Sequence, residues 1–217
     1  MIERLKEIRR KLKHKFKGYP IYKVTDWLVE KKYIQNKTVL EAFANTGEHQ
    51  APAYYKYASY FEAWEIDEKF KSSLTKNLPN ATVKITNSMQ EILVTDKKFD
   101  VIVLDAHMGM FGNGYCEHFN ILPNVFRVAN DDVVVILNVM PYAEEKWRKK
   151  YETVFSKEHL KMRKEFYGDA FDVNHCSYDE MISFYKEYFL SKNYQVTDYF
   201  FHQRHLLHYL AIKAHKI

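Results

Sequence analysis

The stretch Thr38-Val-Leu-Glu-Ala-Phe-Ala-Asn-Thr-Gly47 begins as an apolar run and ends in a turn that contains Asn, Thr and Gly. The apolar half, residues 38–43, has the composition of a buried strand. Glu41 then stands at the strand end, and the turn after it lets a ligand approach the backbone closely. The stretch therefore predicts the first strand of an α/β fold, with a ligand site at its carboxyl end.

Further β-like runs follow at a regular spacing, and helix-compatible sequence lies between them. The runs are 59–66, 82–86, 99–105 and 133–139, and the helical stretches are 49–57, 68–77, 88–95 and about 116–129. Two of the runs are apolar on both faces, which is typical of strands buried in a parallel sheet. We expect βαβ units that form a doubly wound, mostly parallel sheet.

The C-terminal part of the chain changes character. A helix rich in Tyr and Phe at about 177–192 precedes two runs, 194–201 and 206–214. The short gap between these runs suits a hairpin and is too short for a parallel crossover. We therefore expect a seven-stranded sheet with an antiparallel C-terminal strand. Residues 142–175 fit neither pattern and are interpreted as an inserted helix plus an active-site loop.

Composition excludes several classes of protein. The chain has 217 residues, 47% of them hydrophobic, with six Gly and five Pro, so it is neither disordered nor low in complexity. Its longest unbroken apolar stretch, 133–137, is far too short for a membrane span, and its start lacks the apolar core of a secretory signal. Cys116 and Cys176 make neither a disulfide framework nor a zinc site. We expect a cytoplasmic protein without a metal and without a membrane partner.

Positive charge is concentrated at the N-terminus. Residues 1–23 contain nine Lys and Arg and two Glu, a local +7 against +5 for the whole chain, so the other residues carry about −2. Such a segment can follow a phosphate backbone. It can equally be the solvated face of a helix, because Ile2, Leu5, Ile8, Leu12 and Phe16 recur at helical spacing. We divide the chain into a basic helical extension, 1–35, and a sheet domain, 36–217.

Ligands of doubly wound sheets bind at the carboxyl ends of the strands. Glu65 ends the second strand, where a carboxylate can accept both hydroxyls of a ribose. The chain lacks the Gly-x-Gly-x-x-Gly pattern of nicotinamide sites and the lysine of a P-loop.

These residues together resemble class I, Rossmann-like S-adenosylmethionine-dependent methyltransferases. Residues 41–47 are similar to the first motif in its Asp-x-Phe-x-Gly-x-Gly form, Glu65 matches the ribose-binding acid, and 99–105 resemble the fourth motif. Residues 87–89 occupy the place of the adenine-contacting motif. The resemblance implies S-adenosyl-L-methionine as cofactor, with contacts from Glu41, Phe43, Asn45, Thr46, Gly47, Glu65, Ile66, Asp67, Ser88, Met89 and Asp105.

The chain departs from the family pattern at several positions. Asn45 replaces a glycine, and Ser88 replaces the acid that contacts adenine. Asp105 is followed by Ala-His-Met instead of Pro-Pro-Tyr, which disfavours methylation of a flipped adenine. No Pro-Cys dipeptide is present, which disfavours covalent methylation of pyrimidine C5.

The segment after the fourth motif is the candidate catalytic region. Asp105 and His107 are the candidate catalytic residues: Asp105 would orient the acceptor, and His107 would take its proton. His107 can also simply cap a turn of this glycine-rich loop. Candidates for an acceptor pocket are Tyr167, Phe171, His175 and Cys176, whereas the aromatic residues expected in the core are Phe184, Tyr185, Tyr188 and Phe189.

The sequence thus predicts an enzyme that transfers a methyl group to a nitrogen or oxygen acceptor. Nucleic acid, RNA rather than DNA, is the favoured acceptor because of the basic N-terminal segment. Small-molecule methylation is the alternative, since a basic helix can also cover a small pocket. A methyltransferase fold that binds a catalytic subunit or RNA without catalysis is the third hypothesis, because the family pattern is degenerate at Asn45 and Ser88.

Overall fold

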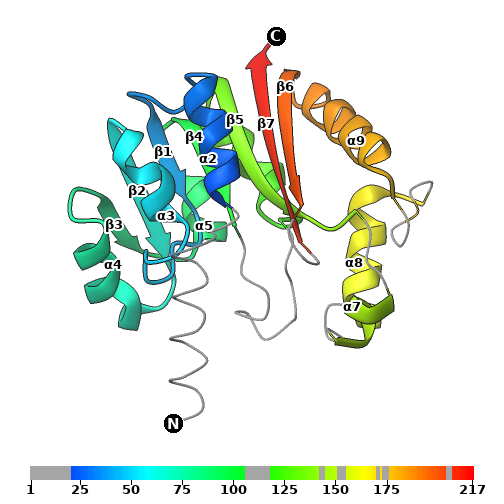
Figure 1. Ribbon diagram of the computed structural model, residues 1–217, viewed down its shortest axis with the longest axis horizontal. Helices are drawn as coiled ribbons and strands as arrows, with labels where there is room; N and C mark the ends of the chain where they lie inside the picture. Colours follow the sequence, from blue (N-terminus) through cyan, green and yellow to red (C-terminus); the bar gives the residue numbers. More distant parts are fainter. Residues whose placement is uncertain are drawn as a thin grey trace.

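The computed structural model describes residues 21–105, 118–141, 145–150, 155–169, 172, 176–203 and 207–217. Within these ranges seven strands form one sheet in the order β3-β2-β1-β4-β5-β7-β6 (Figure 1). The strands are β1 Thr38–Glu41, β2 Tyr60–Glu65, β3 Thr82–Ile85, β4 Phe99–Leu104, β5 Ala129–Val139, β6 Tyr194–Gln203 and β7 His208–Lys216. The helices are α2 Ile21–Glu30, α3 Ala51–Tyr54, η1 Tyr55–Tyr57, η2 Glu68–Phe70, α4 Lys71–Asn77, α5 Ser88–Val94, α6 Leu122–Val128, α7 Glu145–Lys150, α8 Lys157–Tyr167 and α9 Tyr178–Leu190.

The first five strands run parallel to one another, and β7 is antiparallel to both of its neighbours, β5 and β6. The expected mostly parallel sheet with an antiparallel C-terminal strand is thereby confirmed. The strand order reverses between β1 and β4, so the carboxyl ends of these two strands flank the topological switch point, where open α/β sheets bind their ligands.

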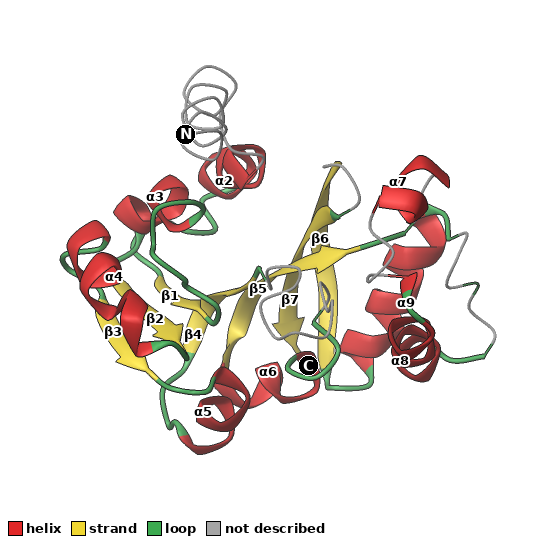
Figure 2. Cartoon of the chain, turned by 90° about the horizontal axis from the view of Figure 1, so that it is seen from below, coloured by secondary structure: helices red, strands yellow, loops and turns green. Residues whose placement is uncertain are grey.

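Helices cover both faces of the sheet (Figure 2). On one face α2, α3 and α4 bury a core that includes Val24, Leu28, Tyr54 and Leu74. On the other face α5, α6 and α9 bury a core that includes Ile92 and Val125 together with Tyr185 and Phe189 of α9. Alternate residues of each strand enter the two cores, because successive side chains of a strand point to opposite faces.

The structure extends one strand beyond its expected start. β5 begins at Ala129 instead of residue 133, although Asn130, Asp131 and Asp132 are poor strand formers. Asp132 pairs with His215 in the ladder and accepts hydrogen bonds from Lys213 at 3.1 Å and His215 at 3.2 Å. The basic end of β7 therefore holds the acidic start of β5 in the sheet.

The segments outside the sheet agree only in part with expectation. The region 142–175 contains two described helices, α7 and α8, instead of one. α2 lies within the segment 1–35, which we interpret from the sequence as a helical extension, and it packs on α3, β6 and β7 of the sheet domain. None of the described helices is long and apolar enough to cross a membrane.

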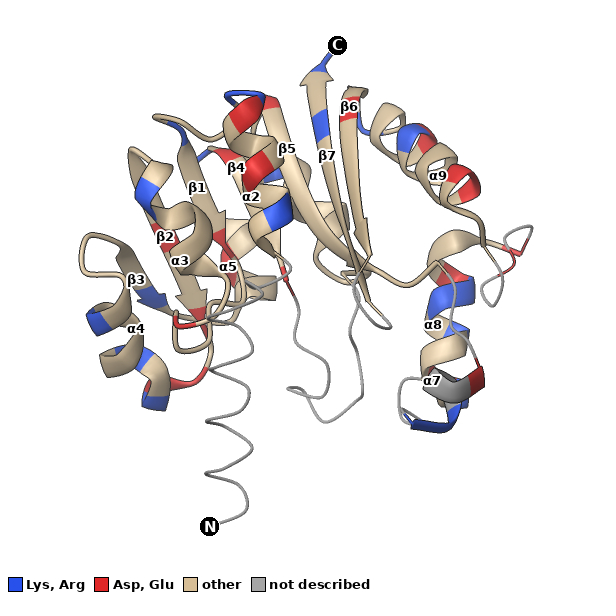
Figure 3. Cartoon of the chain, in the orientation of Figure 1, with Lys and Arg blue, Asp and Glu red and all other residues tan. Residues whose placement is uncertain are grey.

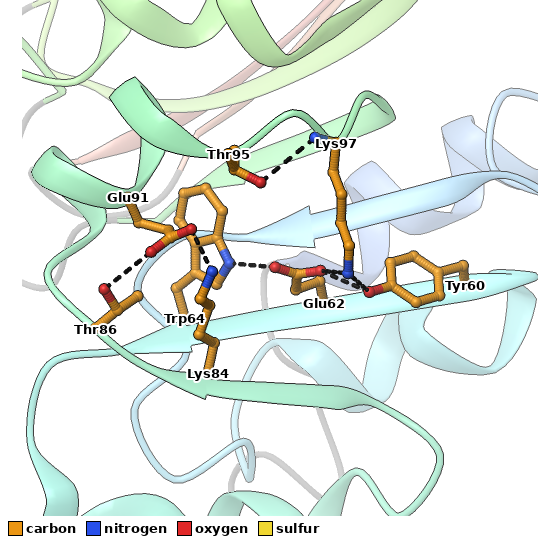
Figure 4. A network of polar contacts seen from close by, with 8 residues as sticks. All are labelled: Tyr60, Glu62, Trp64, Lys84, Thr86, Glu91, Thr95 and Lys97. Carbon is orange, nitrogen blue, oxygen red and sulfur yellow. Dashed lines mark hydrogen bonds and ion pairs between the residues drawn. The ribbon is translucent and has the colours of Figure 1, made fainter.

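A buried polar network joins the β2 and β3 side of the sheet to α5 and the residues that follow it (Figure 4). The Glu62 carboxylate is 1% exposed and accepts hydrogen bonds from Lys97 at 2.6 Å, Tyr60 at 2.6 Å and Trp64 Nε1 at 2.7 Å. Burial raises the pKa of Glu62, but these three donors together lower it by more, so the pKa lies below its ordinary value.

Replacing Glu62 should destabilise the fold because a buried hydrogen-bond donor then lacks its acceptor. Glu62→Ala leaves Trp64 Nε1 without its acceptor, and we expect the free energy of unfolding to fall by about 2–4 kcal/mol in urea denaturation. The contribution of the carboxylate is complete above its unfolded pKa and is lost as the pH falls through the lowered folded pKa. The control is Glu68→Gln, whose exposed pairing with Lys71 should matter by less than about 0.5 kcal/mol. Equal decreases in the free energy of unfolding for Glu62→Ala and Glu68→Gln would contradict this stabilising role of Glu62.

Candidate functional site

Three carboxylates meet at the carboxyl edge of the parallel strands, on the face covered by α2 and α3. In the ladder Glu41 pairs with Ala63 of β2 and with Val103 of β4. Glu65 and Asp105 each lie two residues beyond these partners, so they face the same side of the sheet as Glu41. All three are buried, with exposed fractions of 2% to 8%. The structure thus brings together acids that lie far apart in the sequence.

Backbone amides hold the Glu65 carboxylate. Oε2 accepts from the amide of Asn45 at 2.7 Å, and Oε1 accepts from the amide of Asp67 at 2.9 Å. A carboxylate offers about four lone-pair sites, so two of them are used in this way. The arrangement fixes the orientation of the acid and ties the turn after β1 to the end of β2.

The turn after β1 explains why asparagine can replace glycine there. Asn45 has a φ of 50°, in the left-handed region, which asparagine tolerates better than most residues. Gly47 has a φ of 69°, and a Cβ there would lie 2.8 Å from Leu74 Cδ1 of α4. Backbone conformation and helix packing therefore require the glycine, whereas the sequence pattern alone suggested that a closely approaching ligand requires it.

Two side chains from distant strands hold Asp105. Asn138 Nδ2 of β5 donates to Oδ1, and the Tyr209 hydroxyl of β7 donates to Oδ2 at 2.6 Å. Both donors are almost completely buried, at 0% and 1% exposed. They set the direction of the carboxylate at the end of β4.

The pKa of Glu41 is raised to about 8. Burial raises it most, the nearby charges of Asp105 and Glu65 contribute to the increase, and the Tyr54 hydroxyl lowers it. Glu41 Oε2 and Tyr54 Oη are nevertheless buried without a hydrogen-bond partner of good geometry among the described residues. A buried carboxyl in such surroundings favours its neutral form.

The other proposed cofactor residues lie around these acids. Ile66 is 49% exposed directly after Glu65, and Thr46 Oγ1 is buried without a partner in the described ranges. The Ser88 hydroxyl donates to the Ala42 carbonyl and so ties α5 to the turn. Asp67 caps η2 by accepting from the Lys69 amide at 3.1 Å. Phe43 and Met89, the remaining proposed cofactor residues, are partly buried and pack against the core on the α5 face.

Two of the acceptor-pocket candidates lie in the core instead. Tyr167 and Cys176 are each 5% exposed, and burial raises the pKa of the Cys176 thiol to about 12. The Tyr167 hydroxyl lies 3.0 Å from that of Tyr185, which lies 2.7 Å from His118 Nε2. His118 Nδ1 lies 3.1 Å from the Asn138 carbonyl, which can only accept, so Nδ1 carries the proton and Nε2 accepts from Tyr185.

Several predicted residues lie outside the described ranges: His107, Cys116, Phe171, His175 and the basic residues 1–20. Of the aromatic residues expected in the core, Tyr185 and Phe189 are fully buried, and Phe184 and Tyr188 pack partly buried against them. Within the part of the chain that is described, no group of three or more His, Cys, Asp or Glu side chains could hold a metal ion.

Tyr54, Asn138 and Tyr209 belong to the site but were not predicted from the sequence. Asn138 left a usable signal, because it is a polar residue near the end of the apolar run of β5. Tyr54 and Tyr209 left none, since each is one of 17 tyrosines. Their positions follow only from the packing of α3 and from the pairing of β7 with β5.

Comparison with known proteins places the fold. The chain matches the structure of magnesium protoporphyrin IX methyltransferase from Synechocystis PCC 6803 with bound S-adenosylhomocysteine at a TM-score of 0.55 and 10% identity, over 91% of this chain and 81% of that one. It matches a protein assigned as an RNA methyltransferase from Pyrococcus horikoshii at 0.53 and 14%, over 91% and 84%. It matches a protein assigned as a methyltransferase from Escherichia coli at 0.52 and 12%, over 91% and 86%.

No protein-family model matches the sequence, and no curated protein matches it. The structural matches show that the chain has the Rossmann-like fold of class I S-adenosylmethionine-dependent methyltransferases. The Synechocystis enzyme has also been solved with S-adenosylmethionine bound, which is the cofactor associated with this fold.

The raised pKa of Glu41 predicts a stability that falls as the pH rises. Between pH 4.5 and about 8 the unfolded chain releases this proton and the folded chain keeps it, so the free energy of unfolding decreases across that window. At 1.36 kcal/mol per pKa unit the loss amounts to at most about 5 kcal/mol. Urea denaturation at pH 5 and pH 8.5 should show this loss in the wild type and not in Glu41→Gln. Parallel pH dependences in the two proteins would refute it.

Proposed function

We propose that this chain is an S-adenosylmethionine-dependent methyltransferase with its cofactor at the carboxyl ends of β1, β2 and β4. The observation that carries the proposal is the convergence of Glu41, Glu65 and Asp105 at the switch point of a methyltransferase fold. Three buried oxygens that have no hydrogen-bond partner among the described residues support it: Glu41 Oε2, Tyr54 Oη and Thr46 Oγ1. Buried polar groups normally have partners, and a ligand can supply them.

Each residue near the cofactor has a role that follows from its contacts. Glu65 would accept the ribose hydroxyls on the lone pairs that the amides of Asn45 and Asp67 leave free. The exposed side chain of Ile66 would cover an apolar face of the adenine. The turn 45–47 would border the amino-acid part of the cofactor.

The cofactor supplies a methyl group bonded to a positively charged sulfur, which leaves as a neutral thioether when an acceptor lone pair bonds the methyl carbon. Asp105, held by Asn138 and Tyr209, would accept a hydrogen bond from the acceptor's N–H or O–H. The imidazole of His107 would take the proton that the methylated acceptor loses. The protein thus contributes orientation and removal of a proton.

RNA is the acceptor that we propose. On the outer helices of the described part, basic and acidic positions are mixed (Figure 3), and some of them lie close together, as Lys161 and Glu165 do at 3.6 Å. The excess of positive charge lies instead in residues 1–23, at +7 against about −2 for the remainder. That segment supplies the charge that a phosphate backbone requires.

Loss of Glu65 should abolish tight cofactor binding. In calorimetric titration with S-adenosylmethionine we expect micromolar affinity for the wild type and an affinity at least about tenfold weaker for Glu65→Ala, since hydrogen bonds to a charged group contribute about 1.5–3 kcal/mol. Glu68→Gln, an exposed acid three residues further along the chain, is the matched control and should bind like the wild type. Equal affinities in all three proteins would remove Glu65 from the site.

Reversal of charge in the N-terminal segment should separate RNA from small-molecule acceptors. With Arg9, Arg10, Lys11 and Lys13 changed to Glu, we expect weaker RNA binding. The slope of log affinity against log salt concentration should also become less steep, by roughly 0.7 to 0.9 for each phosphate that the variant no longer neutralises. Methyl incorporation from labelled cofactor into total RNA should fall in parallel, while cofactor affinity stays unchanged. Unaltered RNA methylation in this variant would argue against the proposed acceptor.

A further inference from the structure

The charge around Glu41 is of one sign among the described residues. The titratable groups that face it are Tyr54 from α3, Glu65 from β2 and Asp105 after β4, with Tyr209 of β7 behind Asp105. None of these groups is a lysine, arginine or histidine. The described titratable groups that act on the Glu41 carboxyl thus bring no positive charge to it.

The three carboxyl groups differ in how their burial is compensated. Glu65 receives two backbone amides, and Asp105 receives two side-chain donors. Glu41 Oε2 receives no donor of good geometry from the described residues, and the Tyr54 hydroxyl beside it is equally without a partner. A bound proton or a positive charge brought by a ligand can compensate the burial of such a carboxyl.

We propose that Glu41 makes the site selective for the positively charged cofactor over its uncharged product, because Glu41 holds a proton in the empty site and releases it when S-adenosylmethionine binds. The inference rests on the proposed function. S-adenosylmethionine carries a positive sulfur that S-adenosylhomocysteine lacks, so it favours the carboxylate form of Glu41 more strongly. The carboxylate in turn stabilises the cofactor more than the product.

Proton release makes binding depend on pH. Affinity for S-adenosylmethionine should increase with pH up to about pH 8, near the pKa to which burial raises Glu41, by at most about tenfold per pH unit. Affinity for S-adenosylhomocysteine should increase less. The ratio of the two affinities is therefore the sensitive quantity.

The test is calorimetric titration of the full chain with each of the two ligands at pH 6, 7 and 8. Two buffers of different protonation enthalpy report the number of protons released. We expect the affinity ratio of the wild type to rise at least about fivefold from pH 6 to pH 8, with more protons released by S-adenosylmethionine than by S-adenosylhomocysteine. In Glu41→Gln the affinity ratio should rise less with pH. The amino groups of the two ligands titrate in the same way with either protein, so the difference between the wild type and Glu41→Gln reports Glu41 alone.

Tyr54→Phe provides a second variant that keeps the acid. Because the Tyr54 hydroxyl lowers the pKa of Glu41, its removal should shift the rise in the affinity ratio to higher pH. If the wild type and Glu41→Gln bind both ligands with the same pH dependence, the inference is wrong and the proposed function stands. If the wild type binds neither ligand, the inference and the proposed function are both wrong.

A measurement on the empty protein decides the first half of the proposal separately. In a carbon-13 titration of the carboxyl groups, the resonance that is lost in Glu41→Gln should have its midpoint near pH 8. A midpoint near the ordinary value of 4.5 would overturn the proton-holding role even if the cofactor binds.

Discussion

A carboxylate that leaves water must gain hydrogen-bond donors or a proton, and three such groups share one edge of this sheet. Glu65 gains the amides of Asn45 and Asp67, and the turn after β1 takes its shape from that requirement. Asp105 gains Asn138 and Tyr209, which couples the end of β4 to β5 and β7. Glu41 Oε2 receives no donor of good geometry from the described residues, and its pKa is raised, which favours a bound proton. One constraint thus accounts for the shape of the turn, the coupling between the two halves of the sheet and the electrostatics of the site.

Most of the fold could be predicted because its signals are local. Apolar runs of five to eight residues, separated by stretches of helical sequence, identify the parallel strands, and the short gap before β7 identifies the hairpin. The start of β5 could not be predicted, since Asn130, Asp131 and Asp132 have little strand propensity of their own. Long-range pairing holds them in the strand: Asp132 pairs with His215 of β7, about 80 residues later in the chain, and Ala129 pairs with Phe99 of β4.

The meeting of three acids at one edge of the sheet could be predicted on the same terms. Glu41, Glu65 and Asp105 each end an apolar run, and parallel strands carry such residues to one edge. Asn138 left a local signal as a polar residue near the end of an apolar run, but the contacts of Asn138 and Tyr209 with Asp105 span 33 and 104 residues of sequence, and no local pattern reveals those contacts. Tyr167 and Cys176 look like pocket residues in the sequence, but the packing of α8 and α9 buries them. Side chains that depend on tertiary packing are the ones that sequence patterns miss.

The position of β7 also governs the order in which the sheet can assemble. β6 precedes β7 in the chain, yet its only ladder in the described sheet is with β7, which pairs with β5 over eight residues. β6 therefore joins the sheet only through β7, whose pairing with β5 spans about 80 residues of sequence, and pairing over such a separation forms slowly. Hydrogen exchange would report the same hierarchy in the native state: opening of β7 deprotects β6, whereas β6 can fray alone. β7, which supplies the Tyr209 donor to Asp105, thus also connects β6 to the rest of the sheet.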